Sequence, residues 1–239
     1  MAIRFDATGE ELARLTTPPP MYSCTLMAWV KIAALPASYG TFFSIEWAAG
    51  QYHAALVQST GLFRLFSANG PGFANGATLA VGIWYHIAFT IAGSSAGQFL
   101  GYLNGVQNIS HTAKASATAT GIRFGRVNDG DDLNGTEAAL KVWNRVLTAA
   151  QIRAEMGYVV PLIFTDLNTW APCEASRAAL HHDLGPYQQH LTVGGTVTSA
   201  PGPPIAWAPQ RRTVWGQLAA AGTPAGPKVN SWMLAGVGR

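Results

Sequence analysis

The feature that most constrains this chain of 239 residues is a succession of short segments in which apolar and polar residues alternate. In residues 24–32, for example, Cys24, Leu26 and Val30 fall on one side of an extended chain. Clusters of Gly, Pro, Asn, Asp and Ser separate such segments at intervals of about ten residues. This pattern is typical of an all-β sandwich or barrel.

Most of the expected elements are strands. They are predicted at residues 3–5, 24–32, 41–47, 52–58, 62–67, 84–92, 98–104, 106–110, 121–126, 138–143 and 190–198. Asn104 and Gly105 tolerate the positive φ angles of a two-residue hairpin turn. Thr148 is a good N-cap for a helix over residues 149–156, and a second helical stretch is expected at 174–180. The glycine-rich residues 69–76 are predicted to be a surface loop.

From residue 200 onward the composition changes to prolines and glycines with scattered tryptophans. Because proline lacks a ladder donor and fixes φ, we expect an extended arm here. The chain is therefore divided into a β-sandwich of residues 1–199 and an arm of residues 200–239. Tryptophans on a free arm would be exposed, so the arm is expected to dock in cis or in trans. The docking residues are predicted to be Trp207, Arg211, Arg212, Trp215 and Trp232.

Charged residues make up 11% of the chain and hydrophobic residues 49%, whereas about 25% of an average soluble domain is charged. Two explanations stay open: an Ala/Gly-rich β protein, or a subunit that hides surface against its neighbours. The apolar runs are shorter than the roughly 18 residues of a membrane span. Four basic residues within 200–239 are too few to indicate nucleic acid.

The N-terminal residues show no signal-peptide pattern, which predicts cytoplasmic synthesis or export that is independent of a signal peptide. Cys24 and Cys173 lie far apart in the sequence. Unless the fold brings them together, they are expected to be free, buried thiols.

Several motifs occur in a fixed order along residues 2–156. They are the strand at 22–32, Trp84-Tyr85-His86-Ile87-Ala88-Phe89-Thr90, Tyr102-Leu103-Asn104-Gly105, and the stretch 135–156 with Trp143-Asn144-Arg145-Val146-Leu147-Thr148. Together they resemble the laminin G-like and pentraxin branch of the concanavalin A-like jelly rolls. The resemblance implies an antiparallel jelly-roll β-sandwich with one short helix after the last motif strand.

In calcium-binding members of that family, the loop before the final motif supplies oxygen ligands at a rim of the sandwich. Ca²⁺ takes six to eight oxygens. The corresponding candidates here are Asn128, Asp129, Asp131, Asp132 and Asn134. The alternative is a solvated turn, because Asp, Asn and Gly are common loop residues. No other cofactor is expected.

Aromatic side chains near loop ends form a possible sugar platform, with Trp47, Tyr52 and Phe73 as the candidates. Burial in the core is the competing interpretation. The histidines at 181, 182 and 190, beside Asp183, are interpreted as structural, because adjacent residues of an extended segment point to opposite sides. A turn resembling a family ligand stretch follows Asp183, but Gly185-Pro186-Tyr187 replaces the expected Ser-Gly-Asn.

Glycoside hydrolysis, the enzymatic alternative on this fold, needs two carboxylates that flank the scissile bond. Glu46 lies within a predicted inner strand, with no second acid two or four residues away, and Glu137 is expected at the rim. We therefore predict no catalytic residues.

Three functions follow from these observations. The first is a non-catalytic decoration or adhesion subunit of a large assembly, since phage virions use laminin G-like domains as head decorations or tail appendages. Its partners would be other subunits or copies of the chain, without nucleic acid or membrane, on a virion surface or outside the cell. The second is a Ca²⁺-dependent module that binds surface glycans, and the third is an atypical glycoside hydrolase.

Overall fold

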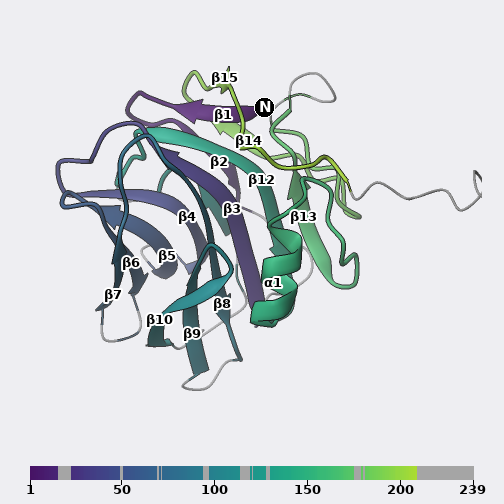
Figure 1. Cartoon of the computed structure of the whole chain (residues 1–239), viewed down its shortest axis with the longest axis horizontal. Coiled ribbons are helices and arrows are strands. Elements are labelled where there is room, and N and C mark those ends of the chain that lie inside the picture. Colours follow the sequence, from purple (N-terminus) through teal and green to yellow (C-terminus); the bar gives the residue numbers. More distant parts are fainter. Residues whose placement is uncertain are drawn as a thin grey trace, which may run out of the picture. The chain divides into compact units, whose positions relative to one another are not determined.

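A computed structural model of the chain describes residues 1–15, 23–48, 51–68, 70, 72–93, 97–113, 119, 121–127, 130–174, 179 and 181–208. Most of these residues belong to two β-sheets that pack face to face (Figure 1). Met1–Ala208 forms one compact unit. No helix within the described ranges is long and apolar enough to cross a bilayer.

Within the described chain, one sheet has eight strands in the order β10-β9-β8-β3-β12-β1-β15, with β13 also paired to β12. Its strands are β1 (Ala2–Phe5), β3 (Cys24–Ile32), β8 (Trp84–Ile91), β9 (Gly97–Leu103), β10 (Val106–Ala113), β12 (Gly135–Trp143), β13 (Leu167–Ala171) and β15 (Thr198–Ala200). The other sheet has seven strands in the order β14-β2-β11-β4-β5-β6-β7. Its strands are β2 (Glu11–Arg14), β4 (Tyr39–Ala48), β5 (Gln51–Gln58), β6 (Leu62–Ser67), β7 (Gly72–Thr78), β11 (Gly121–Phe124) and β14 (Thr192–Gly194). The strand pairs are antiparallel, which confirms the predicted sandwich.

The core between the sheets follows the alternation of the sequence. In β3, Leu26, Ala28 and Val30 are fully buried in this core, as the pattern of residues 24–32 predicts. Cys24 and Cys173 lie in the same core and are free thiols. Burial in this apolar environment raises the pKa of Cys24 to about 12, so the thiol stays protonated and unreactive.

Two local predictions are confirmed by backbone geometry. Asn104 and Gly105 have φ angles of 49° and 75°, as a type I′ turn requires, and they join β9 to β10. Helix α1 (Ala149–Glu155) begins at Thr148, whose hydroxyl accepts a hydrogen bond from the Gln151 N–H. The Gln151 side chain in turn accepts from the Thr148 N–H, which completes a capping box.

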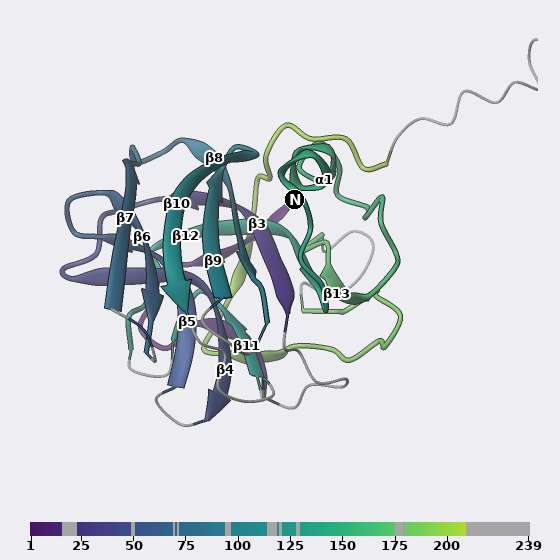
Figure 2. The same ribbon diagram turned by 90° about the horizontal axis from the view of Figure 1, so that it is seen from below.

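Helix α1 covers the outer face of the eight-stranded sheet, beside β3 and on the far side from β4 and β5 (Figure 2). Ile152 of the helix packs with Trp143 and Met27 of the sheet. The buried Lys141 Nζ donates to the Glu155 carboxylate at 2.8 Å, so the charge under the helix is paired.

Two segments differ from their predictions. The expected loop at 69–76 contains the start of β7, an edge strand whose described ladder partner is β6. Pairing with β6 holds this glycine-rich segment extended, although glycine is a weak strand former. The strand expected at 190–198 is interrupted at Gly195 (φ 69°), so β14 joins the seven-stranded sheet and β15 the other one. Of the helical stretch expected at 174–180, residues 175–178 and 180 lie outside the described ranges.

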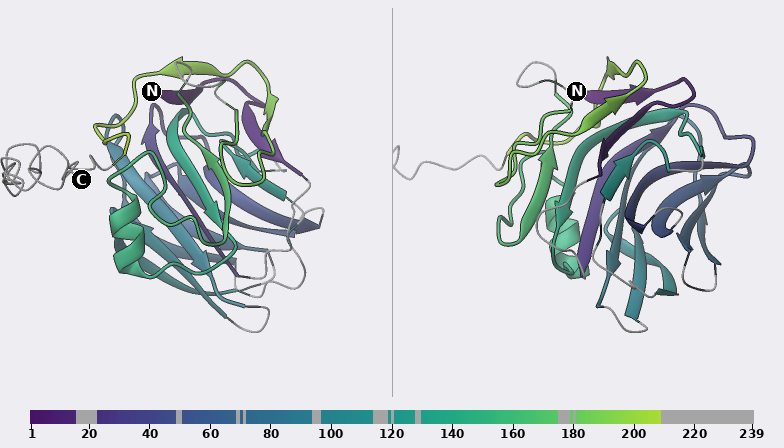
Figure 3. Two further views of the ribbon diagram at one scale, coloured as in Figure 1. Left: turned by 90° about the vertical axis from the view of Figure 1, so that its right-hand side faces the viewer. Right: turned by 180° about the vertical axis from the view of Figure 1, so that it is seen from behind.

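The first residues of the predicted arm dock on the body of the same chain. β15 runs beside β1 near the N-terminus (Figure 3). Further on, Val159 N–H donates to Ala206 O at 2.8 Å and Val160 N–H donates to Trp207 O at 2.8 Å. Residues 200–208 therefore belong to the compact unit, whereas 209–239 lie outside the described residues.

Candidate functional site

The outer face of the seven-stranded sheet brings aromatic and charged side chains together. Ile45, Ala55 and Leu65 on neighbouring strands belong to the inter-sheet core. Because side chains alternate along a strand, the residues next to them point outward. The register places one outward row across β11, β4, β5, β6 and β7, made of Arg123, Ser44, Ala54, Phe66 and Phe73.

At the β6–β7 end of this face, four rings form a continuous cluster, which we name the aromatic platform: Tyr39, Tyr52, Phe66 and Phe73. Tyr39 and Phe73 stack with centroids 5.0 Å apart and an interplanar angle of 16°. Phe66 lies 4.8 Å from Phe73 and 5.1 Å from Tyr52, measured between centroids. The platform packs on Ala54, Leu56 and Val127, which it helps to bury.

The three predicted platform residues have different positions. Tyr52 and Phe73 lie on the outer face, and each contacts Phe66. Trp47 lies instead in the inter-sheet core, because β4 turns it to the same side as Ile45, and it packs against His53. Phe66 was not predicted as a platform residue, because apolar and polar residues do not alternate over 62–67 and the sequence does not show which face of β6 is outward.

Two carboxylates at the other end of the same face are bound to one guanidinium. Arg123 Nε donates to Glu46 at 2.7 Å, and its Nη1 donates to Glu11 at 2.6 and 2.9 Å. Burial lowers the pKa of Arg123, but hydrogen bonds and charges from Glu11 and Glu46 outweigh it, so the net shift is upward. The sequence did not identify Glu11 as a neighbour of Glu46, because Glu11 belongs to β2 and Glu46 to β4, and β11 lies between these two strands. Both carboxylates are acceptors of charge-assisted hydrogen bonds, which would be lost if either were protonated.

Glu137 is not a rim residue, contrary to the prediction. It is 0% exposed, and its neighbours in the register, Ile3 and Val30, belong to the core. Neither carboxylate oxygen has a hydrogen-bond partner in the described structure. Burial raises the pKa of Glu137 well above its ordinary value. Because Glu137 is fully buried, it cannot take part in a site on the surface.

The rim loop expected to bind calcium is described from residue 130 onward, so Asn128 and Asp129 lie outside the described residues. Asp132 and Asn134 line a pocket of about 140 Å³ together with Asp6 and Thr8 of the loop after β1. This second loop was not identified from the sequence. Asp132 Oδ1 already accepts from Gly9 N–H at 3.2 Å and lies 3.4 Å from Arg126 Nε.

Asp131 lies at the start of the same rim stretch, and its backbone oxygen accepts from Thr41 N–H. No group of three His, Cys, Asp or Glu placed to hold a metal is found in the part of the chain that the structure describes. The binding of Ca²⁺ at this rim therefore stays a prediction.

The three histidines of residues 181–190 come together, although the sequence predicted divergent side chains. The His182 and His190 rings stack at 4.1 Å, and His181 lies 4.9 Å from His182. Two parallel stacked rings do not aim their nitrogen lone pairs at a common point. His190 also lines a groove of about 430 Å³ beside β2, together with Glu11 and Thr192.

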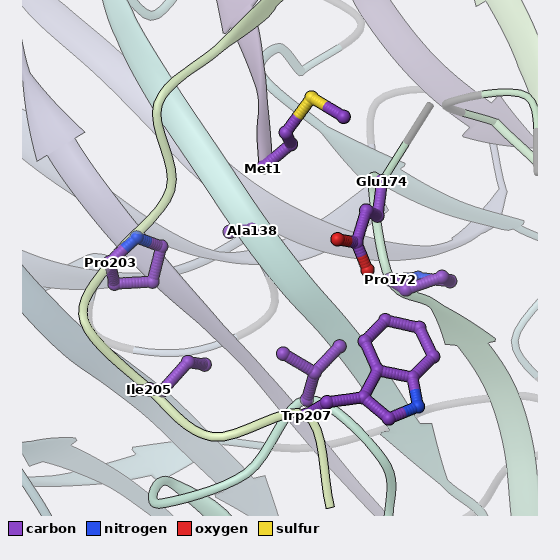
Figure 4. Close-up of a pocket in the computed structure, with 8 residues that line it drawn as sticks. Met1, Ala138, Pro172, Glu174, Pro203, Ile205 and Trp207 are labelled. Atoms are coloured by element: carbon purple, nitrogen blue, oxygen red, sulfur yellow. The ribbon is translucent and has the colours of Figure 1, made fainter. Parts of the chain in front are cut away.

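Among the predicted docking residues, Trp207 is described. It lines a pocket of about 100 Å³ with Met1, Glu174 and Ile205 (Figure 4). Its ring centroid lies 6.2 Å from that of Trp170. Arg211, Arg212, Trp215 and Trp232 lie outside the described residues, so their docking role stays a prediction.

The fold is shared with solved structures of low sequence identity. A candidate carbohydrate-binding protein from Bacteroides ovatus aligns with a TM-score of 0.66 at 15% identity, over 86% of this chain and 61% of that one. A heptameric SAP-like pentraxin from Limulus polyphemus aligns with a TM-score of 0.55 at 18% identity, over 82% and 93%. A Trypanosoma rangeli sialidase gives 0.51 at 16% identity, over 63% of this chain and 26% of the enzyme. The chain thus spans about three fifths of the Bacteroides protein.

A comparison with curated protein sequences gives no match. A family model of the concanavalin A-like lectin/glucanases superfamily matches residues 10–153, which include the motifs of β3, β8, β9 and β12. The match covers more than half of the chain and agrees with the two-sheet sandwich. The chain therefore belongs to the laminin G branch of the concanavalin A-like lectin/glucanases superfamily.

Proposed function

We propose that this chain is a non-catalytic glycan-binding module that holds sugars on the aromatic platform. The observation that carries the proposal is the ring cluster on the outer face of the seven-stranded sheet, in which Tyr39 stacks on Phe73 and Phe66 lies tilted against Phe73. Phe73 is 38% exposed, so part of its ring is available to a ligand. The C–H face of a pyranose is apolar and packs on such rings, while its hydroxyls need polar neighbours.

The acidic groups of this face support binding rather than hydrolysis. A glycosidase needs one carboxyl group that donates a proton and a second that acts as nucleophile or base. Glu11 and Glu46 are both engaged as acceptors by Arg123. A similar fold in a candidate carbohydrate-binding protein is consistent with the proposal and does not by itself establish it.

The test is a glycan array followed by calorimetric titration of the glycans that bind. Phe73→Ala is expected to weaken binding about tenfold or more, on the scale of one lost aromatic stacking contact. Phe164→Ala is the matched control, because Phe164 is 57% exposed and precedes β13 of the other sheet. Equal binding by wild type and Phe73→Ala would remove the platform from the proposal. Release of reducing ends from any bound polysaccharide would overturn its non-catalytic part.

A role as a decoration or adhesion subunit is a second proposal. It is supported by the low charge of the chain and by the basic, tryptophan-bearing residues 209–239. Deletion of 209–239 is expected to abolish self-association or attachment to a partner particle while the body still folds. Unchanged sedimentation and attachment of the deletion variant would count against it.

A further inference from the structure

Arg64 differs from most of the described arginines because no acidic partner is found for it in the part of the chain that the structure describes. Within the described chain, a carboxylate lies within 4.0 Å of the guanidinium nitrogens of Arg4, Arg14, Arg123, Arg126 and Arg145. Among the described residues, no carboxylate lies within this distance of the guanidinium nitrogens of Arg64 or Arg153. Arg153 is exposed, so water solvates its charge, whereas Arg64 is partly buried and its Nε is inaccessible to solvent.

The guanidinium of Arg64 is held in place by the aromatic platform. Its central carbon lies 4.2 Å from the Phe73 centroid and 5.8 Å from the Tyr39 centroid. Nη1 donates to the Tyr39 hydroxyl and to Gln58 Oε1, each at 3.3 Å. These contacts orient the planar group without neutralising it, and Nη2 has no protein acceptor in the described structure.

We infer that Arg64 makes the aromatic platform selective for sugars that carry a carboxylate, such as uronic or sialic acid residues; this rests on the glycan-binding function proposed above. The guanidinium can pair with a carboxylate oxygen through Nη2, because Nε is covered and both Nη1 hydrogens are donated. It is also less strongly hydrated than an ammonium, so it loses less when a ligand covers it. The sugar ring packs on the platform while its carboxylate pairs with Arg64. The carboxylate thereby supplies the counter-charge for which no partner is found among the described residues.

Pre-orientation increases the expected gain in affinity. An arginine free to rotate would lose side-chain entropy when it binds a ligand. Stacking on Phe73 and the two hydrogen bonds from Nη1 already limit that freedom. A charge-assisted pair of this kind is expected to favour an acidic sugar over its neutral counterpart by roughly 10- to 100-fold.

The experiment compares matched pairs of glycans that differ only in the acidic group: polygalacturonate against its methyl ester, and sialyllactose against lactose, within a larger array that also holds sulfated glycans. Among glycans that need Phe73 for binding, carboxylated members are expected to dominate. Binding confined to neutral or to sulfated glycans would overturn the inference and leave the proposed function standing. Binding of no glycan at all would remove the proposed function and, with it, this inference.

Two variants separate charge from geometry. Arg64→Met keeps much of the aliphatic stem and is expected to lower affinity for carboxylated glycans roughly 10- to 100-fold, with little change for neutral ones. Arg64→Lys keeps the charge but not the planar group that lies over Phe73, so an intermediate loss is expected. Equal melting temperatures of the three proteins would show that folding is unaffected. A preference for carboxylated glycans that survives in Arg64→Met would refute the assignment.

Discussion

Acidification should destabilise this protein through a histidine that is buried between the sheets. His53 is 0% exposed, with its ring 4.3 Å from Trp47 and 5.0 Å from Phe99, measured between centroids. Neither ring nitrogen has a hydrogen-bond partner in the described structure. Burial, and to a lesser degree the charge of His111, lower the pKa of His53 from 6.5 to about 3. The folded protein therefore holds this ring neutral.

The sign and size of the effect follow from proton linkage. Between pH 6.5 and about 3 the unfolded chain binds a proton at His53 that the folded chain does not, so stability falls as pH falls through this window. Each pH unit within it costs about 1.4 kcal/mol, or about 2.7 kcal/mol at pH 4.5. His86, whose pKa is also lowered to about 3 by burial and then by Lys141, adds a second effect of the same sign.

The assay is urea unfolding at pH 7.5, 6.0, 5.0 and 4.5 for wild type and His53→Phe. The variant should lose less stability than wild type between pH 7.5 and 4.5, by about 2.7 kcal/mol. This difference between pH values is independent of how well the new ring packs. Phe164→Ala, at an exposed ring that does not titrate, is the control. An unchanged pH slope in His53→Phe would refute the assignment of the proton uptake to this ring.

Three further predictions concern other parts of the chain. Glu137→Leu should stabilise the protein by about 1–3 kcal/mol in acid, because it removes a buried polar group without a hydrogen-bond partner in the described structure. The gain should be larger at neutral pH, because the raised pKa of Glu137 makes the stability of the wild type fall as pH rises above the pKa of this group in the unfolded chain. Denaturant titration of both proteins at two pH values measures the difference. Thr148→Ala should lower the unfolding free energy by about 1 kcal/mol through loss of the cap of α1, seen in urea titrations. Millimolar Ca²⁺ should raise the melting temperature of wild type but not of Asp131→Ala; no rise in wild type would end the calcium prediction.

Elements encoded by neighbouring residues could be predicted from the sequence. The apolar face of β3, the positive φ angles at Asn104 and Gly105, and the Thr148 cap each depend on a few adjacent positions. The strand β7 could not be predicted, because its glycine-rich residues are held by pairing with β6. The length of the expected strand at 190–198 was wrong for a similar reason, since β14 and β15 pair with different sheets.

The candidate site could be predicted only in part, because its residues meet through the sheet register. Tyr52 and Phe73 lie on one face, but Trp47 does not, and β4 has register shifts on both sides of its centre that the alternation of the sequence does not reveal. The contact of Arg64 with Phe73 likewise depends on the pairing of β6 with β7. The residue types alone suggested an aromatic platform, but its position could be found only from the pairing of the strands.

Arg123 supports the proposal of recognition over catalysis, because it binds the two carboxylates of this face. Glu11 and Glu46 come from strands on either side of β11, where Arg123 lies between them and bonds to both. Arg123 supplies a counter-charge to two partly buried carboxylates, so its removal is expected to be strongly destabilising, and the arrangement also holds β2, β11 and β4 together. At the opposite end of the face, Arg64 has no such acidic partner in the described chain. The two arginines thus have different consequences: one neutralises acids that hydrolysis would require, and the other leaves a positive charge that a bound acidic sugar would neutralise.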